Sequence, residues 1–302
     1  MSMLTLNPRV AGPAYKVEMA LDVYQLYGDY AEAAAGRTDT AVPRISGTTA
    51  PLFLDLRTLY AALYFPFADL TVGRQIINCG TGAVFSPVDV FSTVSLTDLS
   101  FKRSGSDVVT ARFPVGPLGG VDAVAELPAG RHDNAALVKA FGTVRGWDLS
   151  LVGIYRQKSR TVIGGLAFKG DALVGLCGEA VTLYDRNDRQ WAFEAMAGAD
   201  YSVRSTWFFA AEYMYGERRD VANPLRDWHN LYDSVRFVIS DLMSVAGVVI
   251  ATVPDRHALA TVQYAWNILQ SVDTVWYLRY YRLGAAPYAP DGEGGLRLTV
   301  KF

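Results

Sequence analysis

The sequence predicts an all-β fold, a transmembrane antiparallel up-and-down β-barrel of about 16 strands. Two observations predict it. Apolar and polar residues alternate with a period of two along most of the 302 residues, and aromatic residues stand at the ends of the apolar runs. Successive side chains of a strand point to opposite faces, so this alternation gives each strand one apolar face and one polar face. Counts of about 14 or about 18 strands fit the same pattern.

The segment 14–28 sets the pattern, with Tyr15 and Val17 on one face and Lys16 and Glu18 on the other. Helical periodicity would scatter these charges around a cylinder. We therefore expect strands along the whole chain and a single barrel domain over residues 1–302. The expected strands are 14–28, 51–65, 68–78, 107–115, 118–127, 134–145, 147–156, 160–169, 171–184, 190–202, 205–215, 232–241, 243–253, 257–268, 273–284 and 296–302.

Composition limits the classes of function. Hydrophobic residues make up 51% of the chain, yet no apolar run reaches the length of a membrane-spanning helix. A net charge of −2 gives no basic surface for nucleic acid, and 3 His and 2 Cys leave little material for a metal site. We expect no cofactor and no metal. The first residues, MSMLTLNPRV, lack the features of a signal peptide, so we expect the sequence of a mature exported chain.

The connections differ in length between the two ends of the expected strands. Counting back from a periplasmic Phe302 places the long connections 29–50, 79–106 and 216–231 at the external end. The tight connections, at Gly146, Gly170, 203–204 and 270–272, then fall at the periplasmic end. Short periplasmic turns with longer external loops are typical of outer-membrane barrels.

Aromatic residues bracket the apolar faces. Ten residues of tilted strand climb about 26 Å, close to the apolar band of about 25 Å in such barrels. Trp and Tyr favour the two membrane interfaces, which favours a bilayer over a soluble β-meander or propeller. No repeat with the period of a propeller blade is present either. The expected interface aromatics are Tyr15, Tyr27, Trp147, Tyr155, Trp191, Tyr201, Trp207, Tyr215 and Phe302.

Two motifs then point to a family. Residues 72–91, VGRQIINCGTGAVFSPVDVF, resemble the G-R-Q-x-x-x-W-G-x-G…P-x-D-x-F motif of porin-like outer-membrane barrels of Gram-negative bacteria. Residues 198–215 resemble the G-x-D-Y…E-Y-x-Y strand pair of the same family. Cys79 departs from the motif, since these proteins usually carry Trp there. The matching positions are Gly73, Arg74, Gln75, Gly80, Gly82, Pro87, Asp89, Phe91, Gly198, Asp200, Tyr201, Glu212, Tyr213 and Tyr215.

The resemblance implies a channel for passive or facilitated diffusion of a small polar solute across a bacterial outer membrane. It implies contact with outer-membrane lipid, and Phe302 resembles the terminal signal read by the barrel-assembly machinery. Porins of this size are often trimers, and the sequence leaves monomer and trimer open. The loop 79–106, with Cys79, Pro87 and Asp89, either folds into the lumen as a constriction or packs on the barrel rim.

Charged residues on the polar faces are the candidates for lining a pore. Both signs occur in similar numbers, so a one-sided ring that would select anions or cations is not predicted. Alternatively, these residues pair across strands and stiffen the wall. The candidates are Lys16, Asp55, Arg57, Arg112, Lys139, Arg156, Glu179, Glu194, Glu212, Arg236, Arg279, Arg297 and Lys301, with Arg74 joining them if a bulge shifts its register.

Other functions are less favoured. His132, His229 and His257 lie in or beside expected connections without a suitable serine, and inward carboxylates such as Glu179 and Glu194 are routine in pores, so no enzyme is expected. Cys79 and Cys177 are expected to remain thiols, although an oxidising periplasm would permit a bridge. The remaining alternatives are a closed or plugged barrel that serves as a scaffold or partner anchor, and a transporter of hydrophobic substrates with a lateral opening near 243–253.

Overall fold

The structure is a computed structural model that describes residues 2–25, 44–45, 52–92, 103–127, 134–220, 223–253, 257–269, 272–282 and 292–300. These residues form strands joined by turns and irregular segments. Within these ranges, no helix is long and apolar enough to cross a membrane.

Nineteen strand segments follow one another along the described chain. Their bounds are β1 Ser2–Leu6, β2 Arg9–Ala11, β3 Tyr15–Gln25, β4 Arg44–Ile45, β5 Leu52–Tyr64, β6 Asp69–Gln75, β7 Ser106–Pro114, β8 Gly119–Glu126, β9 Ala135–Val144, β10 Trp147–Arg156, β11 Thr161–Asp171, β12 Gly175–Asp185, β13 Gln190–Val203, β14 Trp207–Asp220, β15 Asn223–Ser240, β16 Met243–Val253, β17 His257–Leu269, β18 Val272–Arg282 and β19 Gly292–Val300.

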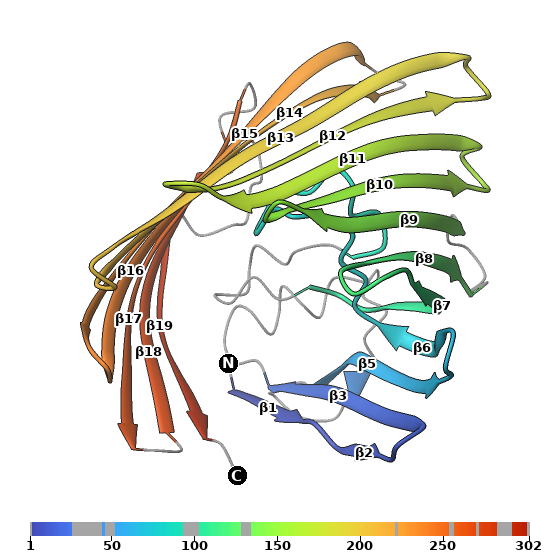
Figure 1. The fold of residues 1–302 in the computed structure, drawn as a ribbon. Coiled ribbons are helices and arrows are strands. Elements are labelled where there is room, and N and C mark those ends of the chain that lie inside the picture. The colour runs from blue at the N-terminus through green and yellow to red at the C-terminus, as the bar shows by residue number, and fades with distance from the viewer. Residues whose placement is uncertain are drawn as a thin grey trace. The chain divides into compact units, whose positions relative to one another are not determined.

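The strands form an antiparallel meander, in which each long strand pairs with the next one along the chain (Figure 1). The contacts divide the chain into two compact units. Unit 1 comprises residues 1–79, 89–140 and 154–159, and unit 2 comprises residues 80–88, 141–153 and 160–302. Unit 1 holds the ladder β3–β5–β6–β7–β8, and unit 2 holds the ladder from β11 to β19.

The predicted fold class is confirmed, and the described strands match the alternative count of about 18. β1 pairs with residues 21–25 of β3 and β2 with residues 16–18, so the two act as one interrupted strand. Nineteen segments less this one junction leave eighteen strands. The two strands that the alternation did not reveal are β1/β2 and the two-residue β4, because neither is long enough to show a period.

Two of the predicted tight turns are present where expected. The β9–β10 turn has positive φ at Arg145 and Gly146, and the β13–β14 turn has positive φ at Arg204 and Ser205. Positive φ at both central residues matches the twist of a tight hairpin. Residues 270–271 lie outside the described ranges.

The predicted turn at Gly170 is wrong. Gly170 lies inside β11, and the chain turns at residues 172–174 instead. A Cβ at Gly170 would stand 2.5 Å from the Trp147 ring, so the glycine makes room for an aromatic side chain of the neighbouring strand. Glycine in a strand often marks such a close approach.

The predicted long connection 216–231 is also wrong. These residues continue β14 and β15, whose ladder runs on to the pair Asp220 and Asn223. The period-two hydrophobic pattern stops well before the hydrogen bonds do. A strand that extends past the apolar band needs no apolar face, so its alternation disappears while its backbone pairing persists.

The two faces of the sheet differ in polarity, and the apolar face is the exposed one. Large apolar side chains are exposed on the face that we call outward, including Leu151 at 65%, Trp191 at 63% and Leu278 at 70%. Charged side chains are covered on the opposite, inward face, including Asp22 at 0% and Glu179 at 3%. A soluble protein has the reverse arrangement, whereas a membrane barrel places apolar residues outside and polar residues inside.

Candidate functional site

Residues Gly80–Val88 lie on the inward face, where hydrogen bonds to two wall carboxylates hold them. They group with unit 2 and lie against two strands, β12 and β14, from which the buried carboxylates of Glu179 and Glu212 project. We call residues 80–88 the inner segment. Gly198 stands opposite Glu212 and Met196 opposite Glu179. Strand β13 therefore lies between the two strands that carry the carboxylates.

Glu179 accepts five hydrogen bonds from the inner segment. Its Oε1 accepts from the backbone N–H of Thr81 at 2.5 Å and of Gly82 at 3.0 Å, and from the Thr81 hydroxyl at 3.1 Å. Its Oε2 accepts from the Ser86 hydroxyl at 2.7 Å and from the Val88 N–H at 3.3 Å. One side chain therefore ties both ends of the segment together.

Glu212 holds the middle of the inner segment. Its Oε1 accepts from the Ala83 N–H at 2.5 Å, and its Oε2 from the N–H groups of Val84 at 3.1 Å and Phe85 at 2.9 Å. Three successive N–H groups converge on one carboxylate, which is the geometry of a backbone anion nest.

These contacts explain how two carboxylates stay covered, at 3% exposure for Glu179 and 6% for Glu212. A buried charge is costly unless hydrogen bonds replace its hydration. Hydrogen bonds to an ionised acceptor are stronger than neutral ones, so the segment and the wall stabilise each other. Glu194, on the neighbouring strand β13, is not opposite Glu179: it lies opposite Val181 and Gly216 in the register.

The two glycines of the inner segment are required by close packing. A Cβ at Gly80 would stand 1.9 Å from the Ser86 hydroxyl and 2.5 Å from Glu179 Oε1. A Cβ at Gly82 would stand 1.8 Å from the Phe85 carbonyl oxygen. The G-x-G part of the motif therefore reports a backbone that folds tightly onto its own chain and onto a carboxylate.

The residues that flank the inner segment are fixed within unit 1. Asp89 accepts a hydrogen bond from the Cys79 N–H at 2.5 Å and forms an ion pair with Arg103. Lys139, on β9, donates to the Cys79 carbonyl oxygen at 2.9 Å. The hydrogen bond between the predicted constriction residues Cys79 and Asp89 therefore joins the two ends of the inner segment. The third such residue, Pro87, lies within that segment.

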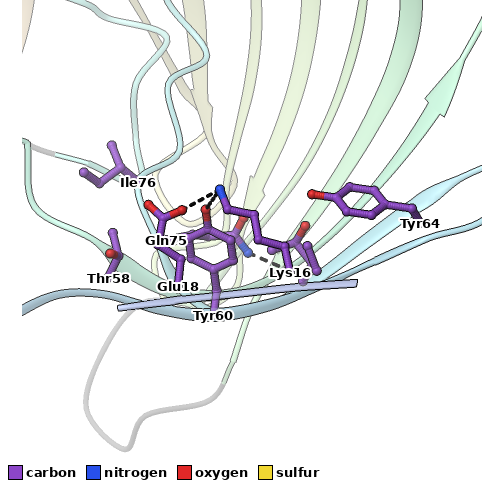
Figure 2. A pocket seen from close by; sticks show the side chains of 9 residues that line it. Lys16, Glu18, Thr58, Tyr60, Tyr64, Gln75 and Ile76 are labelled. Carbon is purple, nitrogen blue, oxygen red and sulfur yellow. Dashed lines mark hydrogen bonds and ion pairs between the residues drawn. The ribbon is translucent and has the colours of Figure 1, made fainter. Parts of the chain in front are cut away.

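A cleft of about 320 Å³ lies on the inward face of unit 1, between β3, β5 and β6 (Figure 2). Lys16 crosses it, with Nζ 2.5 Å from Glu18 Oε2 and 2.9 Å from the Tyr60 hydroxyl. Figure 2 shows the Tyr64 hydroxyl pointing toward Lys16. The lining residues are Lys16, Glu18, Thr58, Tyr60, Ala62, Tyr64, Thr71, Gln75 and Ile76.

A bulge decides which residues of β5 face the cleft. The β3–β5 register passes from Ala20 opposite Thr58 to Leu21 opposite Leu56, which leaves Arg57 as the extra residue. Arg57 turns inward, and its Nε lies 2.6 Å from the buried Asp22. A strict period of two puts Tyr60 on the apolar face with Leu56, and this placement is wrong because the bulge shifts the alternation.

Most predicted pore residues occupy inward positions, where they alternate with exposed apolar neighbours. Arg112 forms a two-point pair with Asp122, with both distances 2.7 Å. Arg279, at 5% exposure, donates to the hydroxyls of Thr261 and Tyr281. The predicted residues at inward positions are Lys16, Asp55, Arg57, Arg112, Lys139, Arg156, Glu179, Glu194, Glu212, Arg236, Arg279 and Arg297.

Arg74 is an exception. It lies opposite Leu59, which is 45% exposed, and pairs with Asp107 at 3.1 Å. It therefore belongs to the outward face, while its neighbour Gln75 lines the cleft. Gly73, at φ 123°, stands just before Arg74. Lys301 lies outside the described residues.

The predicted interface aromatics that the structure describes stand on the outward face. Tyr15, Tyr155, Trp191, Tyr201 and Trp207 are exposed by 39% to 63%. Neighbouring rings partly cover the other two. Trp147 contacts Phe168, and Tyr215 contacts Phe193 and His229. Tyr27 and Phe302 lie outside the described residues.

The remaining reactive side chains are histidines and cysteines. His229 shares a hydrogen bond of 2.6 Å with Tyr213 on the outward face, and His257 begins β17. His132 lies outside the described ranges. No disulfide joins Cys79 and Cys177 in the described residues. No group of three metal-ligating side chains gathers in the part of the chain that the structure describes.

No protein-family model matches the chain, and no curated protein matches it in sequence. Solved structures do match it. Escherichia coli Wzi, an outer-membrane carbohydrate-binding β-barrel involved in group 1 capsule assembly, aligns with a TM-score of 0.65 at 12% identity, covering 99% of this chain and 78% of Wzi. The chain has the fold of an outer-membrane β-barrel.

Two Pseudomonas aeruginosa proteins show the same similarity. OccK11 (OpdR) aligns with a TM-score of 0.60 at 11% identity, covering 99% of this chain and 93% of OccK11. OpdK, crystallised with vanillate, aligns with a TM-score of 0.63 at 9% identity, covering 99% of this chain and 90% of OpdK. The fold agrees with the porin-like resemblance of residues 72–91.

The sequence did not reveal several residues that shape the inward face. Asp22, Glu18 and Asp122 stand on the polar face of their strands and form ion pairs there. The alternation of the sequence placed these residues on the polar face, but it did not show with which residues they form ion pairs. Thr58 and Tyr60 were hidden by the bulge at Arg57, which carries no residue-type signal.

Proposed function

We propose that this protein is a porin-like channel of a bacterial outer membrane, through which small polar solutes diffuse passively or with facilitation. The exposed apolar outward face supports the membrane location, and the charged inward face supports a water-filled passage. Outer-membrane lipid is then the partner of the outward face. Charged residues of both signs line the inward face, so we expect no strong preference for anions or cations.

The inner segment carries this proposal. Nine residues lie across the inward face of unit 2, held by two wall carboxylates. In a barrel, that face encloses the lumen, so the segment narrows the passage there. This arrangement favours the constriction interpretation of residues 79–91 over a loop packed on the rim.

A liposome-swelling assay tests the proposal. Proteoliposomes that contain the folded protein should admit small sugars and amino acids faster than protein-free liposomes, with rates that fall steeply as solute size increases. Heat-modifiable migration in detergent gels verifies that each sample is folded. Entry no faster than in protein-free liposomes would contradict the channel.

The alternative is a barrel that the inner segment closes, serving as a scaffold or partner anchor. The buried apolar side chains of Val84, Phe85 and Val88 favour it, since they fill space without offering polar groups to a solute. A variant lacking residues 81–86 separates the two functions. A closed barrel predicts a silent wild type and a permeable deletion variant, whereas a channel predicts a permeable wild type and a wider deletion variant.

The structure does not favour a lateral opening for hydrophobic substrates near 243–253. β16 pairs with β15 from Met243 to Val253 and with β17 from Met243 to Thr252. Both edges of this strand are therefore hydrogen-bonded over its length.

A further inference from the structure

We propose that the cleft between β3, β5 and β6 is a binding subsite for an uncharged, hydroxyl-rich solute, namely a small saccharide. This inference rests on the proposed channel function, because it names the class of solute that the channel takes. Four properties of the cleft support it: its charge balance, its hydroxyl groups, its exposed tyrosine and its size.

The charges of the cleft are compensated within it. Lys16 Nζ lies 2.5 Å from Glu18 Oε2 and also donates to the Tyr60 hydroxyl at 2.9 Å. The ammonium group also stands 5.3 Å from the centre of the Tyr60 ring. An anionic solute would have to compete with Glu18 for Lys16, so the site offers no unshared positive charge to a carboxylate.

One hydroxyl of the cleft lacks a partner. Thr58 is 8% exposed, and its Oγ1 has no hydrogen-bond partner among the described residues. A covered hydroxyl without a partner is unfavourable, and rotation about its single side-chain torsion would turn it toward a ligand. Thr58 lines the cleft beside Tyr60, and its Oγ1 is covered, so this rotation would bring the unmet hydrogen bond to the cleft.

The other polar groups of the cleft suit hydroxyl partners. Gln75 Nε2 makes only long contacts, 3.3 Å to the Val108 carbonyl oxygen and 3.5 Å to that of Thr71. Threonine, tyrosine and glutamine side chains each donate and accept hydrogen bonds, as sugar hydroxyls do. A carboxylate only accepts and would use half of this capacity.

Tyr64 supplies an aromatic surface at the edge of the cleft. It is 41% exposed, and its hydroxyl points toward Lys16 (Figure 2). An aromatic ring with a polar tip offers a flat apolar face to the C–H side of a sugar ring while its hydroxyl remains hydrated. The cleft volume of about 320 Å³ lies at the small end of ligand sites.

Isothermal titration calorimetry of the full-length protein in detergent tests the inference with two matched probes. Maltose is neutral, and maltobionate is its oxidised counterpart, with the reducing-end ring opened and one carboxylate. Neutral maltitol, which is opened at the same ring, separates the effect of the charge from that of ring opening. We expect maltose to bind and maltobionate to bind at least tenfold more weakly. Thr58→Val removes one hydroxyl without changing the side-chain shape, and it should weaken maltose binding by about three- to tenfold. Tyr64→Leu should weaken it as well.

Tyr281→Phe is the matched control, because it removes a tyrosine hydroxyl that accepts from Arg279 on the inward face of unit 2. It should leave maltose affinity unchanged. Equal or tighter binding of maltobionate, absence of maltose binding, or unaltered affinity in both cleft variants would overturn the inference. Conductance without maltose binding would contradict the subsite alone. Maltose binding without conductance would support the subsite and contradict the channel.

Discussion

At the scale of single residues, two glutamates determine where the inner segment lies. Glu179 and Glu212 accept hydrogen bonds from nearly every donor that residues 81–88 present to the wall. A carboxylate accepts on both oxygens and carries a full charge, and no neutral side chain of similar size does both. Substitutions at these positions therefore test the segment directly.

Glu212→Gln should loosen the inner segment. The substitution removes the charge and turns one acceptor into a donor that faces the N–H groups of Ala83, Val84 and Phe85. Loss of charged hydrogen bonds costs about 1.5–3 kcal/mol each. Amide hydrogen exchange at residues 83–85 should accelerate by at least tenfold. Glu217→Gln, on the same strand, is the control. If exchange at residues 83–85 accelerated equally in this control, the role of Glu212 in holding the segment would be contradicted.

Gly82→Ala should displace the segment because its Cβ would stand 1.8 Å from the Phe85 carbonyl oxygen. The backbone must then move, at a typical cost of about 1–3 kcal/mol. The melting temperature should fall. Gly153→Ala is the control, since its Cβ would have nothing within 4 Å. A variant at position 82 that melts like the position-153 control would rule out the close packing described above.

Asp22→Asn should destabilise unit 1. Asp22 has 0% exposure and pairs with Arg57 at 2.6 Å, so the substitution leaves a covered guanidinium without its counter-charge. Breaking a buried pair in this way costs about 3–5 kcal/mol. Urea unfolding measures the loss. Asp148→Asn, at an exposed aspartate bonded to Thr143, should cost far less. Similar losses at both positions would contradict the buried pair.

At the scale of elements, the alternation of a strand identifies its faces until the register changes. The two-residue period assigned the outward and inward faces correctly in β3, β10, β13 and β14. None of these strands contains a bulged residue within its alternating segment. The period failed in β5, where one bulged residue moves Tyr60 to the inward face. A bulge depends on backbone geometry and on a partner such as Asp22, neither of which a single segment displays.

Leu151→Arg tests whether the outward face of β10 meets lipid. Leu151 is 65% exposed and lies near the middle of its strand, and Ser150 next to it faces inward. An arginine on the lipid face at mid-depth costs about 2–4 kcal/mol, whereas one facing the lumen costs much less. Folding into phospholipid vesicles, followed by denaturant titration, measures both variants. Equal stabilities of Leu151→Arg and Ser150→Arg would contradict the membrane assignment.

At the scale of the whole molecule, the fold was predictable because sixteen of the strands repeat the same two-faced pattern over most of their length. The inner segment was only half predictable. Its glycines and Asp89 matched a motif, and Glu179 and Glu212 were recognisable as inward carboxylates. The sequence could not show that these carboxylates hold the motif. The hydrogen-bond partners lie far apart in the chain, 98 residues in one pair and 129 in another. Such contacts depend on strands that are brought together only in the folded sheet.

The central claim is that the inward face encloses an open passage narrowed by residues 80–88. Single-channel recording of the purified wild-type protein in planar lipid bilayers tests it most directly. An open passage predicts discrete, reproducible conductance steps, with larger steps in the variant that lacks residues 81–86. Persistent silence of wild-type protein that shows heat-modifiable migration would contradict the claim.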